Sequence, residues 1–231
     1  MKKNVLSIIP ARGGSKGIIK KNLQIVGGLP LVVHSINQSL ESRIVNRVVV
    51  STDDKEIAWI SKKYGAEVIE RPSKFSGDKA HSDLALKHVL YVLLENKNYR
   101  PDTVVFLQPT SPIRKPEQID QAIEKMLNEN ADTCFSACIE HFTGRWETDE
   151  NGDTKPINYE LMNRPMRQDY PEYYLENGSI CVFKPEILEQ TGNRFGRKIA
   201  IYPMNPIESL QIDTMEDLRL IDQLMKNKIS F

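Results

Sequence analysis

Residues 5–9 read Val-Leu-Ser-Ile-Ile, and residues 10–22 continue as Pro-Ala-Arg-Gly-Gly-Ser-Lys-Gly-Ile-Ile-Lys-Lys-Asn. An apolar run that stops at a proline predicts a buried strand. The loop that follows carries one arginine and three lysines. Its glycines let backbone N–H groups approach an anion closely, and its cations add positive charge. A strand that feeds such a loop is a natural place for a triphosphate at the edge of an α/β sheet.

The loop matches neither common phosphate-binding motif. A P-loop ends in Gly-Lys-Ser/Thr, whereas here Lys16 precedes Gly17. The dinucleotide motif Gly-x-Gly-x-x-Gly does not fit the spacing of Gly13, Gly14 and Gly17 either. On glycine and charge alone, a basic surface turn therefore remains an alternative to a phosphate site.

Composition is ordinary for a soluble globular protein and gives no overall basic charge. The 231 residues are expected to form a single domain, 1–231, and Lys plus Arg equal Asp plus Glu at 31 each. This balance argues against a nucleic-acid partner. The three cysteines are expected to be buried free thiols, which suits a cytoplasmic location. The N-terminal apolar run is too short for a signal peptide or a membrane span, so no membrane partner is expected.

Strands and helices are predicted to alternate along the chain, which indicates an α/β fold with a mostly parallel sheet and helices on both faces. The expected strands are 5–9, 46–52, 66–69, 103–107, 133–139, 179–183 and 199–202. The expected helices are 31–40, 55–64, 82–94, one that opens at Pro116, 185–190 and 215–225. Residues 140–177 interrupt this pattern with a polar, aromatic and proline-containing stretch, which is typical of a functional or partner-contacting insert.

Four of the predicted strands end in polar residues. These endings are Arg12, Ser51–Asp54, Arg71 and Gln108–Ser111. A parallel sheet brings such ends to one edge, where α/β proteins bind ligands. Ordinary turns and helix caps explain each ending separately but explain poorly why all four are polar.

Asp213 has two interpretations. Asp213 or Thr214 can cap the helix that follows, with Glu216 or Asp217 closing a capping box. The alternative is a carboxylate ligand for Mg²⁺, which takes few protein carboxylates together with substrate phosphates. The four histidines show no metal-ligand spacing, and no Gly-x-Ser-x-Gly motif supports a serine hydrolase.

Taken in order, these segments resemble the acylneuraminate cytidylyltransferase family, the CMP-sialic acid synthetases and their relatives. The matching segments span nearly the whole chain and are residues 9–17 with Lys21 and Asn22, 49–53, 71–72, 107–112, 177–180 and 212–214. The resemblance implies a Rossmann-like nucleotidyltransferase fold. It also implies a homodimer in which residues 140–177 form a small dimerisation insert that completes the neighbouring site.

The resemblance further implies a reaction between CTP and a nine-carbon 2-keto sugar acid, a nonulosonic acid, that gives a CMP-sugar and pyrophosphate. The implied nucleotide-binding residues are Ala11, Arg12, Gly13, Lys16, Lys21, Asn22, Arg71 and Ser82. The implied sugar-acid-binding residues are Gln108, Thr110, Ser111 and Arg167. The implied Mg²⁺ ligands are Asp213 and Gln211, and the implied catalytic residues are Arg12, Lys21 and Asp213.

The chain departs from the family pattern at two positions. Gln211 stands where the family usually has a second acidic residue beside Asp213, and Cys181 stands where sialic-acid-specific members tend to have tyrosine. A smaller residue at 181 favours a legionaminic- or pseudaminic-type acid over sialic acid as the substrate. The alternatives are a nucleotidyltransferase that uses another nucleotide, such as GTP, and a non-catalytic nucleotide-binding protein, which Gln211 alone favours.

Overall fold

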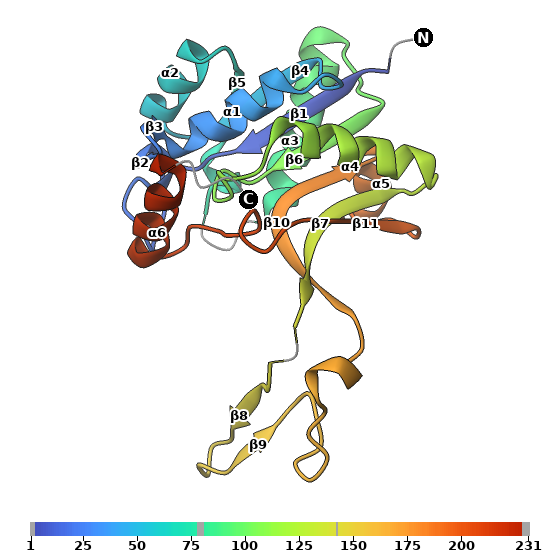
Figure 1. Cartoon of the computed structure of the whole chain (residues 1–231). Coiled ribbons are helices and arrows are strands. Elements are labelled where there is room, and N and C mark those ends of the chain that lie inside the picture. The colour runs from blue at the N-terminus through green and yellow to red at the C-terminus, as the bar shows by residue number, and fades with distance from the viewer. Residues whose placement is uncertain (1–2, 78–80, 142, 228–231) are drawn as a thin grey trace.

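The computed structural model describes residues 3–77, 81–141 and 143–227, and there a central sheet carries helices on both faces (Figure 1). Residues 1–2 and 228–231 of the predicted domain, and residue 142 of the predicted insert, lie outside the described residues. The sheet strands are β1 (Val5–Pro10), β4 (Arg47–Thr52), β5 (Glu67–Glu70), β6 (Thr103–Leu107), β7 (Thr133–Glu140), β10 (Tyr173–Phe183) and β11 (Ile199–Pro203). The α-helices are α1 (Leu31–Glu41), α2 (Lys55–Lys63), α3 (Ser82–Lys97), α4 (Pro116–Asn128), α5 (Pro185–Thr191) and α6 (Met215–Lys226).

Short elements complete the described chain. They are the strands β2 (Ile25–Val26), β3 (Leu29–Pro30), β8 (Trp146–Thr148) and β9 (Thr154–Pro156) and the 3₁₀ helices η1 (Lys21–Leu23), η2 (Ser73–Phe75) and η3 (Arg167–Asp169). The three cysteines are buried free thiols, as predicted. No helix in the described part of the chain combines the length and the apolar character needed to cross a membrane.

The sheet is mostly parallel, as predicted. In the described residues its seven strands run in the order β11-β7-β10-β6-β1-β4-β5, and only β10 is antiparallel to its neighbours. The central strand β1 pairs with β4 on one side and β6 on the other. The chain therefore leaves the carboxyl end of β1 toward one side of the sheet and returns on the other side. Such a switch point opens a crevice at the carboxyl ends of the strands.

The side chains of β1 alternate between two apolar layers. Val5 and Ile9 pack in the layer that α1, α2 and α4 cover. Leu6 and Ile8 pack in the layer that α3 and α5 cover. Because successive residues of a strand point to opposite faces, a run of apolar residues fills both layers. Both faces of the sheet are thus covered, which leaves the edge where the strands end as the place where such folds bind ligands.

Strand β10 is longer than the sequence predicts. Its last five residues, Ser179–Phe183, are the expected strand, but it begins at Tyr173. The pairing of β10 with β7 shifts between Glu176 and Cys181, and Gly178 lies there with a φ of 60°. A left-handed glycine is a common way to insert such an irregularity into a strand. The first part of β10 and the end of β7 consequently leave the sheet as a two-stranded ribbon.

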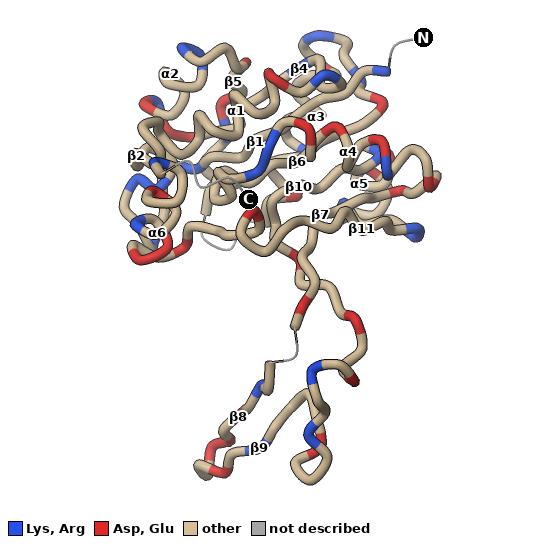
Figure 2. The backbone as a smooth tube through the Cα atoms, in the orientation of Figure 1, with Lys and Arg blue, Asp and Glu red and all other residues tan. Residues whose placement is uncertain are grey.

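Residues 141–172, which we call the arm, extend from this ribbon and project away from the body of the molecule (Figure 1). They include the β8–β9 hairpin and η3, and none of the described arm residues is buried. Several large apolar side chains are exposed here, including Trp146, Leu161 and Met162. Acidic and basic residues are interspersed along the described backbone of both the arm and the body (Figure 2).

Candidate functional site

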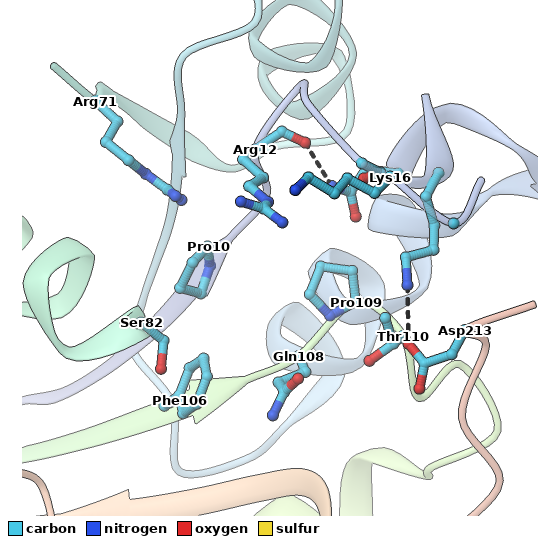
Figure 3. A pocket seen from close by; sticks show the side chains of 14 residues that line it. Pro10, Arg12, Lys16, Arg71, Ser82, Phe106, Gln108, Pro109, Thr110 and Asp213 are labelled. Atoms are coloured by element: carbon cyan, nitrogen blue, oxygen red, sulfur yellow. Dashed lines mark hydrogen bonds and ion pairs between the residues drawn. The ribbon is translucent and has the colours of Figure 1, made fainter. Parts of the chain in front are cut away.

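A cavity of about 410 Å³ opens at the carboxyl ends of β1 and β6 (Figure 3). It brings together side chains from the glycine-rich loop, from the segment after β5, from the start of α3 and from the segment before α6. The residues that line it are Pro10, Arg12, Ser15, Lys16, Gly17, Lys21, Asn22, Arg71, Ser82, Phe106, Gln108, Pro109, Thr110 and Asp213. The cavity therefore lies at the sheet edge where the sequence placed it.

The glycine-rich loop is held in place by hydrogen bonds at both ends. The N–H of Ala11 donates to the carbonyl of Ser51 at 2.9 Å, which continues the pairing of β1 with β4. The backbone N–H of Gly13 donates to Asp53 Oδ1 at 2.9 Å. The side-chain amide of Asn22 donates to the carbonyl of Arg12 at 2.9 Å. Of the implied nucleotide-binding residues, Ala11 is fully buried, and neither it nor Gly13 lines the cavity.

Gly17 is required by a close backbone approach. A Cβ atom at this position would lie 2.7 Å from the carbonyl oxygen of Asp213. By contrast, a Cβ atom at Gly14 would meet nothing within 4 Å. Gly17 thus allows the loop to pack directly against the Asp213 segment, so residues nearly 200 positions apart form one wall.

Four cations face the cavity. Among the residues that the structure describes they are Arg12, Lys16, Lys21 and Arg71, and Asp213 is the one described carboxylate that lines the cavity (Figure 3). Arg71 is buried and donates from Nη2 to the carbonyl of Ser51 at 2.6 Å and from Nε to the Ser51 hydroxyl at 3.1 Å. Burial lowers the pKa of Arg71, with nearby Arg12 acting in the same direction and Asp53 opposing it. An excess of fixed positive charge in a concave site attracts anionic ligands.

Asp213 is paired with Lys21. Lys21 Nζ lies 3.0 Å from Asp213 Oδ1 and 2.9 Å from the carbonyl oxygen of Ile212. The helix cap is made by Thr214 and Asp217, which form the predicted capping box. The carboxylate of Asp213 takes no part in the helix cap, and this side chain is 69% exposed. The cap and the ligand interpretations of this segment are therefore compatible, since different residues serve them.

Only some of the implied sugar-acid-binding residues line the cavity. Gln108 and Thr110 line the cavity, whereas Ser111 is fully buried behind it. The hydroxyls of Thr110 and Ser111 are both buried and have no hydrogen-bond partner among the described residues. An unpaired buried polar atom at a cavity wall is costly unless a ligand or water satisfies it.

Three other implied residues lie away from the cavity lining. Gln211 Oε1 lies beside Gly178, 3.6 Å from where a Cβ atom would stand there. Cys181 is buried and pairs with Phe106 across β10 and β6, and burial raises the pKa of its thiol to about 12. Arg167 belongs to the arm, where it contacts His141 Nδ1 at 3.3 Å and does not line the cavity of its own chain.

The structure adds a residue that the sequence did not single out. Arg194 donates to Asp83 Oδ1 at 2.7 Å and stacks over the ring of Phe106, with 5.2 Å between its Cζ atom and the ring centroid. It thereby fixes the start of α3 beside Ser82, which lines the cavity. The apolar strand end at Phe106 was visible in the sequence, but no local pattern links position 194 to it.

The chain is similar to several known proteins. The cytidylyltransferase family model matches residues 6–231. The chain is 34% identical over 224 residues to the N-acylneuraminate cytidylyltransferase A of Danio rerio, covering 96% of this chain and 50% of that protein. It is 32% identical over 228 residues to the CMP-N,N'-diacetyllegionaminic acid synthase of Legionella pneumophila, covering 96% of each. The chain thus spans about half the length of the first relative and nearly all of the second.

A relative from Campylobacter coli, a post-translational flagellin modification protein B, is 30% identical over 225 residues, covering 97% of this chain and 96% of that protein. Among solved structures, a CMP:2-keto-3-deoxy-manno-octonic acid synthetase complexed with CTP has the same fold, with a TM-score of 0.73 and 17% identity. This match covers 98% of this chain and 100% of the other. The sequence motifs, the fold and these matches together establish that the chain belongs to the cytidylyltransferase family, with the acylneuraminate cytidylyltransferases among its relatives.

Proposed function

We propose that the protein is a cytidylyltransferase that joins CTP to a nine-carbon 2-keto sugar acid of the sialic, legionaminic or pseudaminic type. The products are a CMP-sugar and pyrophosphate. The observation that carries this proposal is the cavity that Arg12, Lys16, Lys21 and Arg71 line, where Asp213 is the one lining carboxylate among the described residues. A triphosphate and a sugar acid are both anions, and this charge excess suits them together.

The reaction needs positioning and charge neutralisation more than covalent help from the protein. The anomeric hydroxyl of the sugar acid attacks the α-phosphorus and gives up its proton. The bond between the α-phosphorus and its bridging oxygen breaks, and pyrophosphate leaves. Arg12, Lys16 and Lys21, on the glycine-rich loop, are placed to hold the triphosphate and to stabilise the charge that develops on the leaving group.

We propose Asp213 as the residue that would hold Mg²⁺, which supplies charge stabilisation to the phosphates when bound. The fit rests on the donor set. Asp213 offers an exposed carboxylate at the cavity wall, and Mg²⁺ takes one or two carboxylates together with substrate phosphates. The described residues contain no cluster of three or more His, Cys, Asp or Glu side chains that could hold a metal ion. The phosphates of CTP would therefore complete the coordination, with the Gln211 carbonyl as a candidate second ligand.

Gln108 and Thr110 are the proposed sugar-acid wall. Both line the cavity on the side of β6, and a polyhydroxylated ligand would supply the hydrogen-bond partner that the buried Thr110 hydroxyl lacks among the described residues. The Legionella relative is named for a legionaminic acid and the Danio relative for acylneuraminate. Cys181 is buried beside Phe106, which lines the cavity, so we propose that a smaller residue at this position widens the site by way of Phe106.

We also propose that the protein acts as a homodimer in the cytoplasm. The arm buries none of its described residues and exposes Trp146, Leu161 and Met162, so it has no apolar core of its own. Such a segment gains stability by packing against another surface. In a two-fold dimer the arm of one subunit would carry Arg167 toward the cavity of the other.

Pyrophosphate release tests the proposed reaction. CTP and Mg²⁺ are supplied with sialic, legionaminic, pseudaminic or the eight-carbon Kdo acid in turn. Release with one nine-carbon acid is the expected result, and it identifies the substrate at the same time. Release only with GTP or UTP would assign another nucleotide. Nucleotide binding without release for any acid, with Mn²⁺ as well as Mg²⁺, would refute the enzyme and favour a nucleotide-binding protein.

A further inference from the structure

Arg114 is a buried arginine that joins three segments beneath the cavity. Its side chain is 2% exposed and lies between α1, the end of β6 and the turn in β10. Nε donates to Gln38 Oε1 at 2.8 Å, and Nη1 donates to the carbonyl of Ser179 at 2.5 Å. Nη2 donates to the carbonyl of Gln108 at 3.0 Å and to the Ser35 hydroxyl.

All of these acceptors are neutral. No carboxylate forms an ion pair with Arg114 within residues 3–77, 81–141 and 143–227, although other buried or half-buried cations, such as Arg194, have one. Burial lowers the pKa of Arg114 to about 9, so the guanidinium keeps its charge at neutral pH. A buried charge without a partner is expensive, and a neutral side chain of similar size would avoid that cost. The retained charge therefore calls for an explanation beyond packing.

The neighbours of Arg114 form the wall of the cavity. Gln108, whose carbonyl it holds, lines the cavity directly. Gln108 is also pressed against the β10 turn, because a Cβ atom at Gly178 would lie 2.7 Å from Gln108 Nε2. Two residues further on, the carbonyl of Thr110 accepts from the N–H of Ile212 at 2.9 Å, next to Asp213. Gln108 thus lies between the Arg114 guanidinium and the cavity.

We propose that Arg114 is a positioning residue for the ligands of this cavity and that its unbalanced charge is balanced by the anionic ligand. It fixes the Gln108 wall against the β10 turn, and it adds positive potential from behind that wall. The charge acts through a protein layer with a lower effective dielectric than water, so it is screened less than a charge at the surface. This inference rests on the proposed function for the choice of ligand.

A purely structural role predicts a different result from a charge-bearing one. If Arg114 only holds the wall, its loss lowers the affinity for every ligand of the cavity by a similar factor. If its charge also acts on the ligand, the loss grows with the number of phosphates. Cytidine, CMP and CTP share a base and a ribose and differ in charge, so they separate the two roles.

The test measures the affinities of cytidine, CMP and CTP for the unmodified protein and for Arg114→Gln by calorimetry. Arg114→Gln is expected to lower the affinity for CTP by about tenfold, the affinity for CMP by less, and the affinity for cytidine by no more than about twofold. The control is Arg100→Gln, which removes the same net charge from an exposed residue paired with Glu189, just before the amino end of β6. It should leave all three affinities unchanged.

Arg114→Lys covers the case in which the glutamine variant does not fold. Lysine keeps the charge but lacks the planar set of donors. It is expected to keep CTP affinity within about threefold while kcat falls, because Gln108 is less firmly held. An equal loss for all three ligands in Arg114→Gln, no loss for CTP in that variant, or a loss of CTP affinity in Arg114→Lys that is well beyond about threefold and exceeds the loss for cytidine, would overturn the inference while leaving the proposed function intact. Failure of the unmodified protein to bind any of the three would overturn both.

Discussion

Lys21 and Asp213 form an ion pair with a contact of 3.0 Å. If Asp213 holds Mg²⁺ as proposed, the metal ion competes with the Lys21 ammonium until phosphates draw that ammonium away. Lys21→Met should raise the affinity of the nucleotide-free protein for Mn²⁺ by ~2- to 5-fold, since an exposed ion pair is worth at most about 1 kcal/mol. Electron paramagnetic resonance of Mn²⁺ measures this without activity.

The neighbouring lysine provides the control for that experiment. Lys20 pairs with Glu56 at 2.6 Å and does not line the cavity, so Lys20→Met should leave Mn²⁺ affinity at Asp213 unchanged. In the activity assay Lys21→Met is expected to lose ~10²- to 10³-fold in kcat, by analogy with the loss of one oxyanion donor. Unchanged Mn²⁺ affinity in Lys21→Met would contradict the competition between the ammonium and the metal.

Gly17 offers a test of the contact between the loop and the Asp213 segment. The backbone carbonyl of Asp213 would stand 2.7 Å from a new Cβ atom, and a backbone atom cannot move away cheaply. Gly17→Ala should reduce the free energy of unfolding by about 1–3 kcal/mol, the usual cost of overpacking. Gly14→Ala, where nothing lies within 4 Å, should leave it unchanged or slightly higher. Urea denaturation compares the two, and equal effects would refute the close approach.

At the scale of the element, α6 begins at a capping box that holds the Asp213 segment. The N–H groups of Asp213 and Thr214 donate to Asp217 Oδ2 at 3.0 and 2.8 Å. The hydrogen bond from the backbone of Thr214, followed by that from Asp213, lowers the pKa of the Asp217 carboxyl. A depressed pKa in the folded state gives stability that is present above the unfolded pKa and is lost as the pH falls through the folded value.

Asp217→Asn should therefore destabilise the protein at pH 7 and much less in acid. The gap in the free energy of unfolding between the variant and the unmodified protein should close as the pH falls below about 4, where the carboxyl becomes protonated. Denaturant titrations at pH 7 and near pH 3 measure it. A gap that stays constant with pH would show that the charge of Asp217 contributes nothing and that only its shape matters.

The helices and strands of the body follow the predicted ranges closely because their apolar periodicity is local. α1, β6 and α4 were each visible as short patterns in the sequence. The long β10 was not, because the shift at Gly178 and the antiparallel pairing with β7 depend on a strand that lies more than 30 residues earlier. Only part of the cavity was predictable, again because local patterns do not show long-range packing. The strand ends identify Arg12, Arg71 and Gln108. Arg114 and Arg194 reach the cavity wall only through the packing of the fold.

At the scale of the whole molecule, the arm decides whether one chain is a complete enzyme. Arg167 lies in the arm and does not line the cavity of its own chain, whereas Lys21 does. If the arm of one subunit serves the cavity of the other, Arg167→Ala and Lys21→Met are defective through different subunits. A mixed dimer of the two variants then contains one cavity with Lys21 and a partner arm with Arg167.

Co-refolding the two inactive variants in equal amounts should restore roughly a quarter of the unmodified activity, because half of the dimers are mixed and each has one intact site. Each variant refolded alone should stay inactive, and light scattering should give the mass of a dimer in all three samples. Replacing Trp146 and Leu161 with Lys should shift that mass toward the monomer, since both side chains are exposed on the arm. No recovery in the mixture, despite a dimeric mass, would mean that Arg167 does not act on the partner's cavity.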